Sequence, residues 1–135
     1  MKINMKDYIA AMLDKVPDTM KGTVCTPAAN HLFEVRNTAA KLNKDHAERF
    51  HHLTAKLLYL SQWGRPDIRT AVAFLSTRVS QTDVNDKKKL GRVMKYLCRS
   101  INLELTLSAD SPPHTTWWVD AAYGVGKGMK SQTRA

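Results

Sequence analysis

The sequence has few acidic residues, few cysteines and no long hydrophobic run. Cys25 and Cys98 are the only cysteines among 135 residues, and no signal-like apolar segment opens the chain. A disulfide framework therefore has no support, and we expect free thiols in a reducing, intracellular compartment, either cytoplasm or nucleus. No run of about 18 apolar residues occurs, so we expect no transmembrane helix and no membrane partner.

The shortage of acid limits the chemistry that the chain can perform. Asp and Glu number twelve in all, no two aspartates are adjacent, and Asp120 is the last acidic residue. Metal-dependent synthesis or hydrolysis of a polynucleotide needs several carboxylates clustered around paired cations. We therefore expect no enzyme activity from this chain on its own, no cofactor bound to it and no small-molecule substrate.

Four of the five histidines lie between His31 and His52, but their spacing does not suit a metal site. His46 and His51 are five residues apart, which separates them around a helix, and the adjacent His51 and His52 point in different directions. No cysteine pair or acidic triad stands nearby. We expect these histidines to be solvated or to lie at the edge of the core.

Positive charge is what the chain has in excess. Lys and Arg number 21 against twelve Asp and Glu, which gives a net charge of +9 and a pI of about 9.8. This excess favours a polyanionic partner, with nucleic acid ahead of an anionic membrane surface. The hydrophobic content of 43% is enough to build the core of one domain of ordinary size.

The hydrophobic spacing predicts an α+β fold, mainly α, with about four helices in the first two thirds of the chain. Asn43 suits the start of a long helix, Gly64 its end, and Pro66 the start of the next, so these two helices should fold against each other as a hairpin. A loop is expected over 17–26, and Pro27 could open a further helical turn. The expected helices cover residues 1–16, 43–63, 66–79 and 82–100.

From Ile101 onward the hydrophobic period changes to that of strands. Alternating residues predict strands over 103–107 and 115–121, joined by a turn over 109–114 and pairing as a β-hairpin. Three glycines follow but lack the strand, loop and helix of a phosphate-binding motif, so we interpret them as a flexible tail. They are Gly124, Gly126 and Gly128.

The last predicted helix carries a line of positive charge beside its apolar stripe. The spacing i, i+4, i+7 and i+11 places four basic residues on one edge. A charge run is ordinarily a solvated face; given the overall charge, contact with the phosphates of a nucleic acid is an equal alternative. These residues, called the basic edge from here on, are Lys88, Arg92, Lys95 and Arg99.

The segment LLYLSQWGRPDIRTAVAFLS resembles copia-type retrotransposon polyproteins, in the part that follows the reverse-transcriptase active site. The matching positions run from Tyr59 through Arg65-Pro66-Asp67-Ile68 to Ser76, and the resemblance continues at Arg92, Val93, Lys95, Tyr96 and Leu97. Two departures stand out, because relatives commonly have His-Trp where this chain has Asp86-Lys87, and Gly-Thr where it has Arg99-Ser100. The second departure puts the exit geometry of that helix in doubt, since Gly would ease a left-handed helix end.

The segment WWVDAAYGVGKGMKSQT resembles the first strand of the ribonuclease H domain in the same polyproteins. The resemblance gives Asp120 the position of the first of four carboxylates that hold two divalent metal ions, magnesium in the intact family, and the other three have no counterparts here. It implies a thumb-like or connection-like helical region over 1–100 and a truncated start of ribonuclease H over 101–135. The implied partners are an RNA/DNA hybrid and the rest of the polyprotein.

Three hypotheses follow for the function. The first is a fragment of a reverse transcriptase and ribonuclease H polyprotein, inactive alone, that contributes binding of the template-primer through the basic edge. The second is a free-standing basic helical module that binds nucleic acid. The third is a catalytic subunit that another polypeptide completes, which would depend on Asp120.

Overall fold

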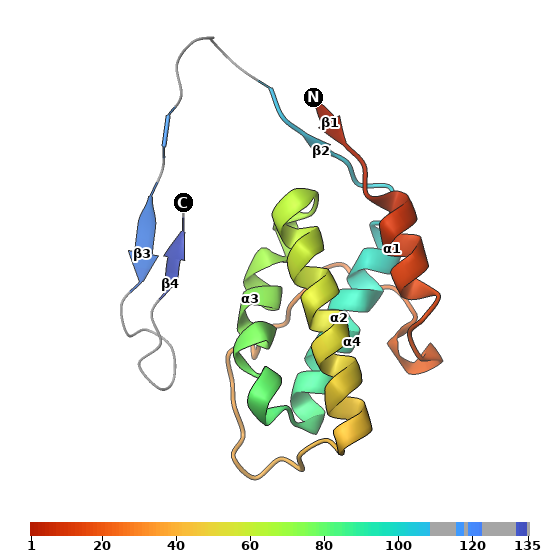
Figure 1. Cartoon of the computed structure of the whole chain (residues 1–135), viewed down its shortest axis with the longest axis vertical. Helices are drawn as coiled ribbons and strands as arrows, with labels where there is room; N and C mark the ends of the chain where they lie inside the picture. The colour runs from red at the N-terminus through yellow and green to blue at the C-terminus, as the bar shows by residue number, and fades with distance from the viewer. Residues whose placement is uncertain (109–115, 118, 123–131, 135) are drawn as a thin grey trace.

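Four α-helices packed around one hydrophobic core make up most of the fold. The computed structural model describes residues 1–108, 116–117, 119–122 and 132–134 (Figure 1). The α-helices are α1 (Lys6–Leu13), α2 (Lys44–Trp63), α3 (Arg69–Thr77) and α4 (Val84–Arg99), and short 3-10 helices are η1 (Asp18–Met20), η2 (Pro66–Ile68) and η3 (Val79–Gln81). The prediction of a mainly helical fold with about four helices is confirmed.

The predicted hairpin of α2 and α3 is present, and its local causes are visible. Asn43 caps α2, because its side-chain oxygen accepts a hydrogen bond from the His46 N–H at 2.9 Å. Gly64 ends the helix at a point where a Cβ atom would collide with the Met5 side chain. Pro66 then opens η2 rather than an α-helix, and α-helical geometry begins only at Arg69.

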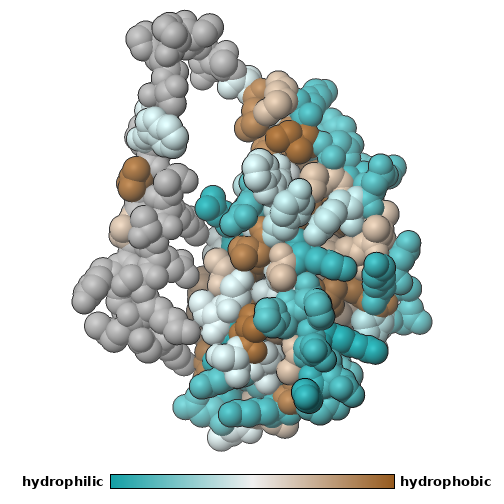
Figure 2. Space-filling model, viewed as in Figure 1, coloured by the Kyte–Doolittle hydropathy of each residue, from teal (hydrophilic) through white to brown (hydrophobic). Residues whose placement is uncertain are grey.

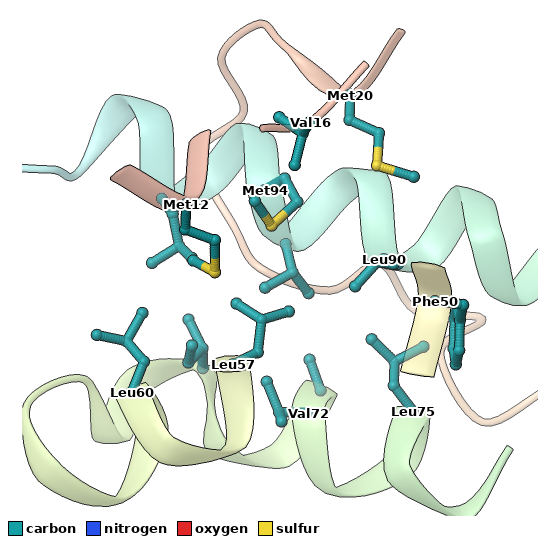
Figure 3. Close-up of a cluster of buried hydrophobic side chains, with 14 of the residues drawn as sticks. Met12, Val16, Met20, Phe50, Leu57, Leu60, Val72, Leu75, Leu90 and Met94 are labelled. Carbon is teal, nitrogen blue, oxygen red and sulfur yellow. The ribbon is translucent and has the colours of Figure 1, made fainter. Parts of the chain in front are cut away.

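The core lies between the four helices and η1 (Figure 3). The sulfur-containing side chains of α1, η1 and α4 meet the branched side chains of α2 and α3 there, and all the apolar residues predicted on one side of α4 are buried. Because burial of each such side chain favours folding by about 1.5–3 kcal/mol, this cluster is the main stabilising feature. Its members are Ile9, Met12, Val16, Met20, Leu32, Phe50, Leu57, Leu60, Ile68, Ala71, Val72, Phe74, Leu75, Leu90, Val93, Met94 and Leu97.

The predicted pairing of residues 103–107 with 115–121 is wrong. β2 (Leu105–Thr106) pairs antiparallel with β1 (Lys2–Ile3), and the Leu107 N–H donates to the Met1 carbonyl at 2.7 Å. The first residues of the chain lead into α1, and α1 packs against α4, so they lie beside the segment that leaves α4 (Figure 1). The other sheet joins β3 (Asp120–Ala122) to β4 (Gln132–Arg134), also antiparallel.

Other expectations about irregular segments have mixed outcomes. The helical turn expected after Pro27 is wrong, because residues 27–33 form only bends and turns, and the Thr26 hydroxyl donates to the Ala28 carbonyl at 3.0 Å. The turn over 109–114 and the three glycines of the expected tail lie outside the described residues. No helix in the part of the chain that the structure describes is long and apolar enough to span a bilayer.

Candidate nucleic-acid interface

The start of α4 is fixed by two buried carboxylates. Asp83 and Asp86 form a reciprocal capping box, in which each side chain accepts a hydrogen bond from the backbone N–H of the other residue. The Arg78 guanidinium lies between them, 3.0 Å from Asp86 Oδ2 and 3.4 Å from Asp83 Oδ2. Asp86, the residue that departs from the copia-type pattern, thus holds both the helix start and a cation of the preceding turn.

The outer side of α4 is strongly basic. The helix carries six Lys and Arg and a single acid, Asp86, whose side chain is buried against Arg78. The positive charges on the outer side therefore have no carboxylate of the same helix beside them in solvent.

The structure places all four residues of the α4 basic edge as the spacing predicts, but not all of them are free. Lys88 and Arg99 are exposed, whereas Arg92 and Lys95 are half-buried under the segment that contains Gly22 and Thr26. Arg92 donates to the Thr26 carbonyl at 3.2 Å and to its hydroxyl at 2.9 Å. Arg99 Nη1 lies 2.9 Å from the Cys25 sulfur.

Beside this edge lies a groove of about 400 Å³ between α4 and the irregular segment 24–36. Three of the four edge residues line it; Arg99 does not. Segment 24–36 adds Arg36 and His31, α4 adds Lys89 and Asn85, and Glu34 is the only carboxylate of the lining. Helical periodicity could identify the edge, but no sequence signal indicated which residues of the irregular segment would face it.

Lys89 links the two walls of this groove. It is only 9% exposed, its Nζ donates to the Glu34 carbonyl at 2.6 Å, and it lies 4.8 Å from the centre of the Phe74 ring. Burial lowers the pKa of its ammonium group, and the nearby carboxylates of Asp86 and Asp83 offset this only in part. Lys89 therefore fixes the segment against α4 instead of offering a solvated charge.

The end of α4 is tied to the junction of α2 and α3. Arg65 is 1% exposed and pairs with both oxygens of Asp67, at 3.0 and 2.7 Å. It also donates to the Ser100 carbonyl and hydroxyl, at 3.0 and 2.6 Å, while the Tyr96 hydroxyl donates to Asp67 at 2.7 Å. Arg-Pro-Asp-Ile therefore has a structural role here, and Arg65 is its central residue.

This network also explains how α4 ends without glycine. Ser100 has φ −104° and ψ 27°, which any residue can adopt, and its hydroxyl donates to the Tyr96 carbonyl at 2.7 Å. The exit geometry that Arg99-Ser100 put in doubt thus needs no left-handed residue. The same Ser100 hydroxyl accepts from Arg65, so it contributes to both contacts.

Comparisons with protein-family models, with curated proteins and with solved structures found no match for this chain. The copia-type relationship stays a prediction from the residues that carry it.

The metal-binding expectations concern Asp120 and the histidines. Asp120 lies in β3, paired through its backbone with Arg134, and its side chain is outside what the structure describes. His31, His46, His51 and His52 are exposed, as expected for solvated side chains. Among the described residues, no three His, Cys, Asp or Glu side chains are grouped to hold a metal ion. These residues therefore supply no ligand set that fits a pair of magnesium ions.

Proposed function

We propose that this chain is a basic helical unit that binds nucleic acid through the α4 basic edge, with no catalytic activity of its own. The observation that carries the proposal is the line of four cations beside a groove with one carboxylate, Glu34. Lys88 and Arg99 are eleven residues apart, which is roughly 16 Å along a helix. Along the axis of a duplex the phosphates of one strand advance about 3.4 Å per nucleotide, so the edge spans the axial length of about five nucleotides.

The parent machine that we propose is a copia-type polyprotein, with the chain spanning the end of reverse transcriptase and the opening of ribonuclease H. An RNA/DNA hybrid is then the natural ligand, and the rest of the polyprotein is the physical partner. The residue pattern around Arg65 and Asp67 supports this proposal, because the hydrogen bonds between these side chains give the residues of the family motif a structural role.

A second candidate is a free-standing helical module with the same ligand. It is favoured by the hydrophobic core, whose members lie between Ile9 and Leu97 and are supplied by the helices, η1, η2 and the adjoining segments. Such a unit should unfold in one cooperative transition. A fragment that needs further polyprotein segments should instead keep its helices while losing fixed tertiary packing.

Binding of a labelled RNA/DNA hybrid, followed by fluorescence anisotropy at several salt concentrations, tests the proposal. Four phosphate contacts predict a slope of log K against log salt of about −3.6, that is, four times −0.9. Replacing all four edge residues by Ala should abolish that slope and most of the affinity. The matched control removes four exposed cations elsewhere: Lys2, Lys41, Lys44 and Arg69.

If the control variant weakens binding as much as the edge variant, attraction to net charge explains the binding and the edge is not an interface. Unchanged binding by the edge variant would also contradict the proposal.

A further inference from the structure

A line of basic and aromatic side chains runs along the outer face of α2, on residues that the proposed function does not use. Arg49, His52, Lys56, Tyr59 and Trp63 follow one another at steps of three or four residues, so they share one face of the helix. Lys56 is half-buried and the other four are exposed. Asp45 and Glu48 lie one turn before Arg49 and His52, so the first turn of this face is mixed in charge. Beyond that turn the face is basic from Arg49 to Lys56 and aromatic at its end.

The aromatic end is a ladder of rings open to solvent. The centres of the Tyr8 and Tyr59 rings are 5.5 Å apart, and those of Tyr59 and Trp63 are 6.3 Å apart. Tyr59 is 49% exposed and Trp63 is 61% exposed. Core packing therefore does not account for these two residues, whose ring surfaces remain available for stacking.

The cationic end borders a second groove, of about 460 Å³, between α2 and the segment that links α1 to η1. Its lining includes Phe50 and Leu53, and Asp14 is the only carboxylate of the lining. Six basic side chains also line it: Lys15, His46, Arg49, His52, Lys56 and Lys87.

Figures 1 and 2 together show where α2 lies and how hydropathy varies over the surface near it. α2 lies on the viewer's side, and the surface over its start at the bottom of the view is strongly hydrophilic. Paler and browner residues become more frequent toward its upper end (Figure 2).

We propose that this face of α2 binds single-stranded nucleic acid, with phosphates at the cationic groove and bases stacked on Tyr59 and Trp63. Proteins that hold single strands without sequence preference combine these two features, a positive track and aromatic platforms. A duplex would keep its bases stacked internally and offer no faces to the rings. An acidic protein surface would pair with the cations but would leave the aromatic ladder without a function.

The site is separate from the α4 basic edge, because the two share no residue. From Arg49 to Trp63 the face extends roughly 21 Å, the length of fourteen helical residues. It can therefore hold several nucleotides of a single strand while the α4 basic edge contacts a duplex.

The test uses a fluorescein-labelled 15-nucleotide oligo(dT) and an abasic strand of equal length, with binding followed by anisotropy. Trp63→Ala should weaken binding of oligo(dT) about 5- to 150-fold, the loss of one stacked base, and should leave the abasic strand unaffected. Trp63→Phe should restore much of the affinity. Trp117→Ala removes an indole that is 77% exposed, more than Trp63, from another segment and should change nothing.

Replacing Arg49 and Lys56 by Ala should weaken both strands alike and reduce the salt slope by about 1.4, that is, twice 0.7 for a single strand. The variant without the α4 basic edge should still bind oligo(dT) more tightly than the abasic strand. A negative result in the RNA/DNA hybrid assay therefore does not imply a negative result in this one.

Equal binding of oligo(dT) and the abasic strand, or unchanged binding by Trp63→Ala, would overturn the proposal. A dimer in sedimentation that Trp63→Ala converts to a monomer would also overturn it, because the ladder would then serve self-association.

Discussion

Replacement of Asp67 by Asn isolates the electrostatic tie between α4 and the hairpin of α2 and α3. Asn keeps the shape of the side chain but removes the charge that faces Arg65, which is 1% exposed and keeps its positive charge. Removing one partner of a buried ion pair typically costs 3–5 kcal/mol, because the other charge stays buried without compensation. Since the Asp67 side chain is 28% exposed, solvent screens part of this loss and we expect about 3 kcal/mol.

The same substitution has a defined pH dependence. Burial raises the pKa of Asp67, but the hydrogen bonds from Arg65 and Tyr96 and the Arg65 charge outweigh it and hold the pKa below its usual value. A carboxyl whose pKa is depressed by folding stabilises the protein above its unfolded pKa, about 3.9, and loses that contribution as the pH falls through the folded value. The difference between wild type and Asp67→Asn should therefore narrow below about pH 4.

Urea denaturation followed by far-UV circular dichroism, at pH 7 and at steps down to pH 2.5, measures both effects. Asp18→Asn is the matched control, because Asp18 pairs with Lys21 but the Asp18 side chain is 93% exposed. The urea midpoint of this variant should equal that of the wild type. If Asp67→Asn lowers the free energy of unfolding at pH 7 by less than about 1 kcal/mol, the reasoning from Arg65 burial is refuted. A difference that stays constant to pH 2.5 would refute the ionic origin of the effect.

Two further predictions follow from the structure. Thr54→Val should stabilise the protein by about 1 kcal/mol in the same urea assay. The reason is that the Thr54 hydroxyl is buried without a hydrogen-bond partner among the described residues, and Val has nearly the same shape. A loss of stability would mean that the hydroxyl has a partner. The purified chain with magnesium should not cleave an RNA/DNA hybrid in a gel assay, and cleavage that Asp120→Asn abolishes would contradict the proposal of a non-catalytic unit.

The features that could be predicted from the sequence are those fixed by neighbouring residues. Asn43 and Asp83 at helix starts act within one turn, so their residue types suffice to place them. Gly64 also suits a helix end by its type, but the contact that excludes a side chain there comes from Met5. The spacing of Lys88 to Arg99 is likewise a property of one helix. Periodicity therefore places these four residues along one side of α4, whereas their role as an interface stays a prediction.

The features that could not be predicted depend on contacts distant in the sequence. The partner of β2 is the chain's first strand, about a hundred residues away, and alternation of apolar residues does not say which strand is adjacent. Lys89 was missed for a related reason, because its partner Glu34 lies in a segment without a period.

The two buried networks hold α4 at both ends, and this bears on binding. Arg78 fixes the start through Asp83 and Asp86, and Arg65 fixes the end through Ser100. Between them, Arg92 is already positioned by Thr26 and has donors left, since a guanidinium carries five N–H groups and its contacts with the described residues engage two of its nitrogens. Because ordering each mobile side chain costs about 0.5–1.5 kcal/mol on association, a prepositioned edge should bind phosphates with a smaller entropic loss than the same cations on a flexible segment.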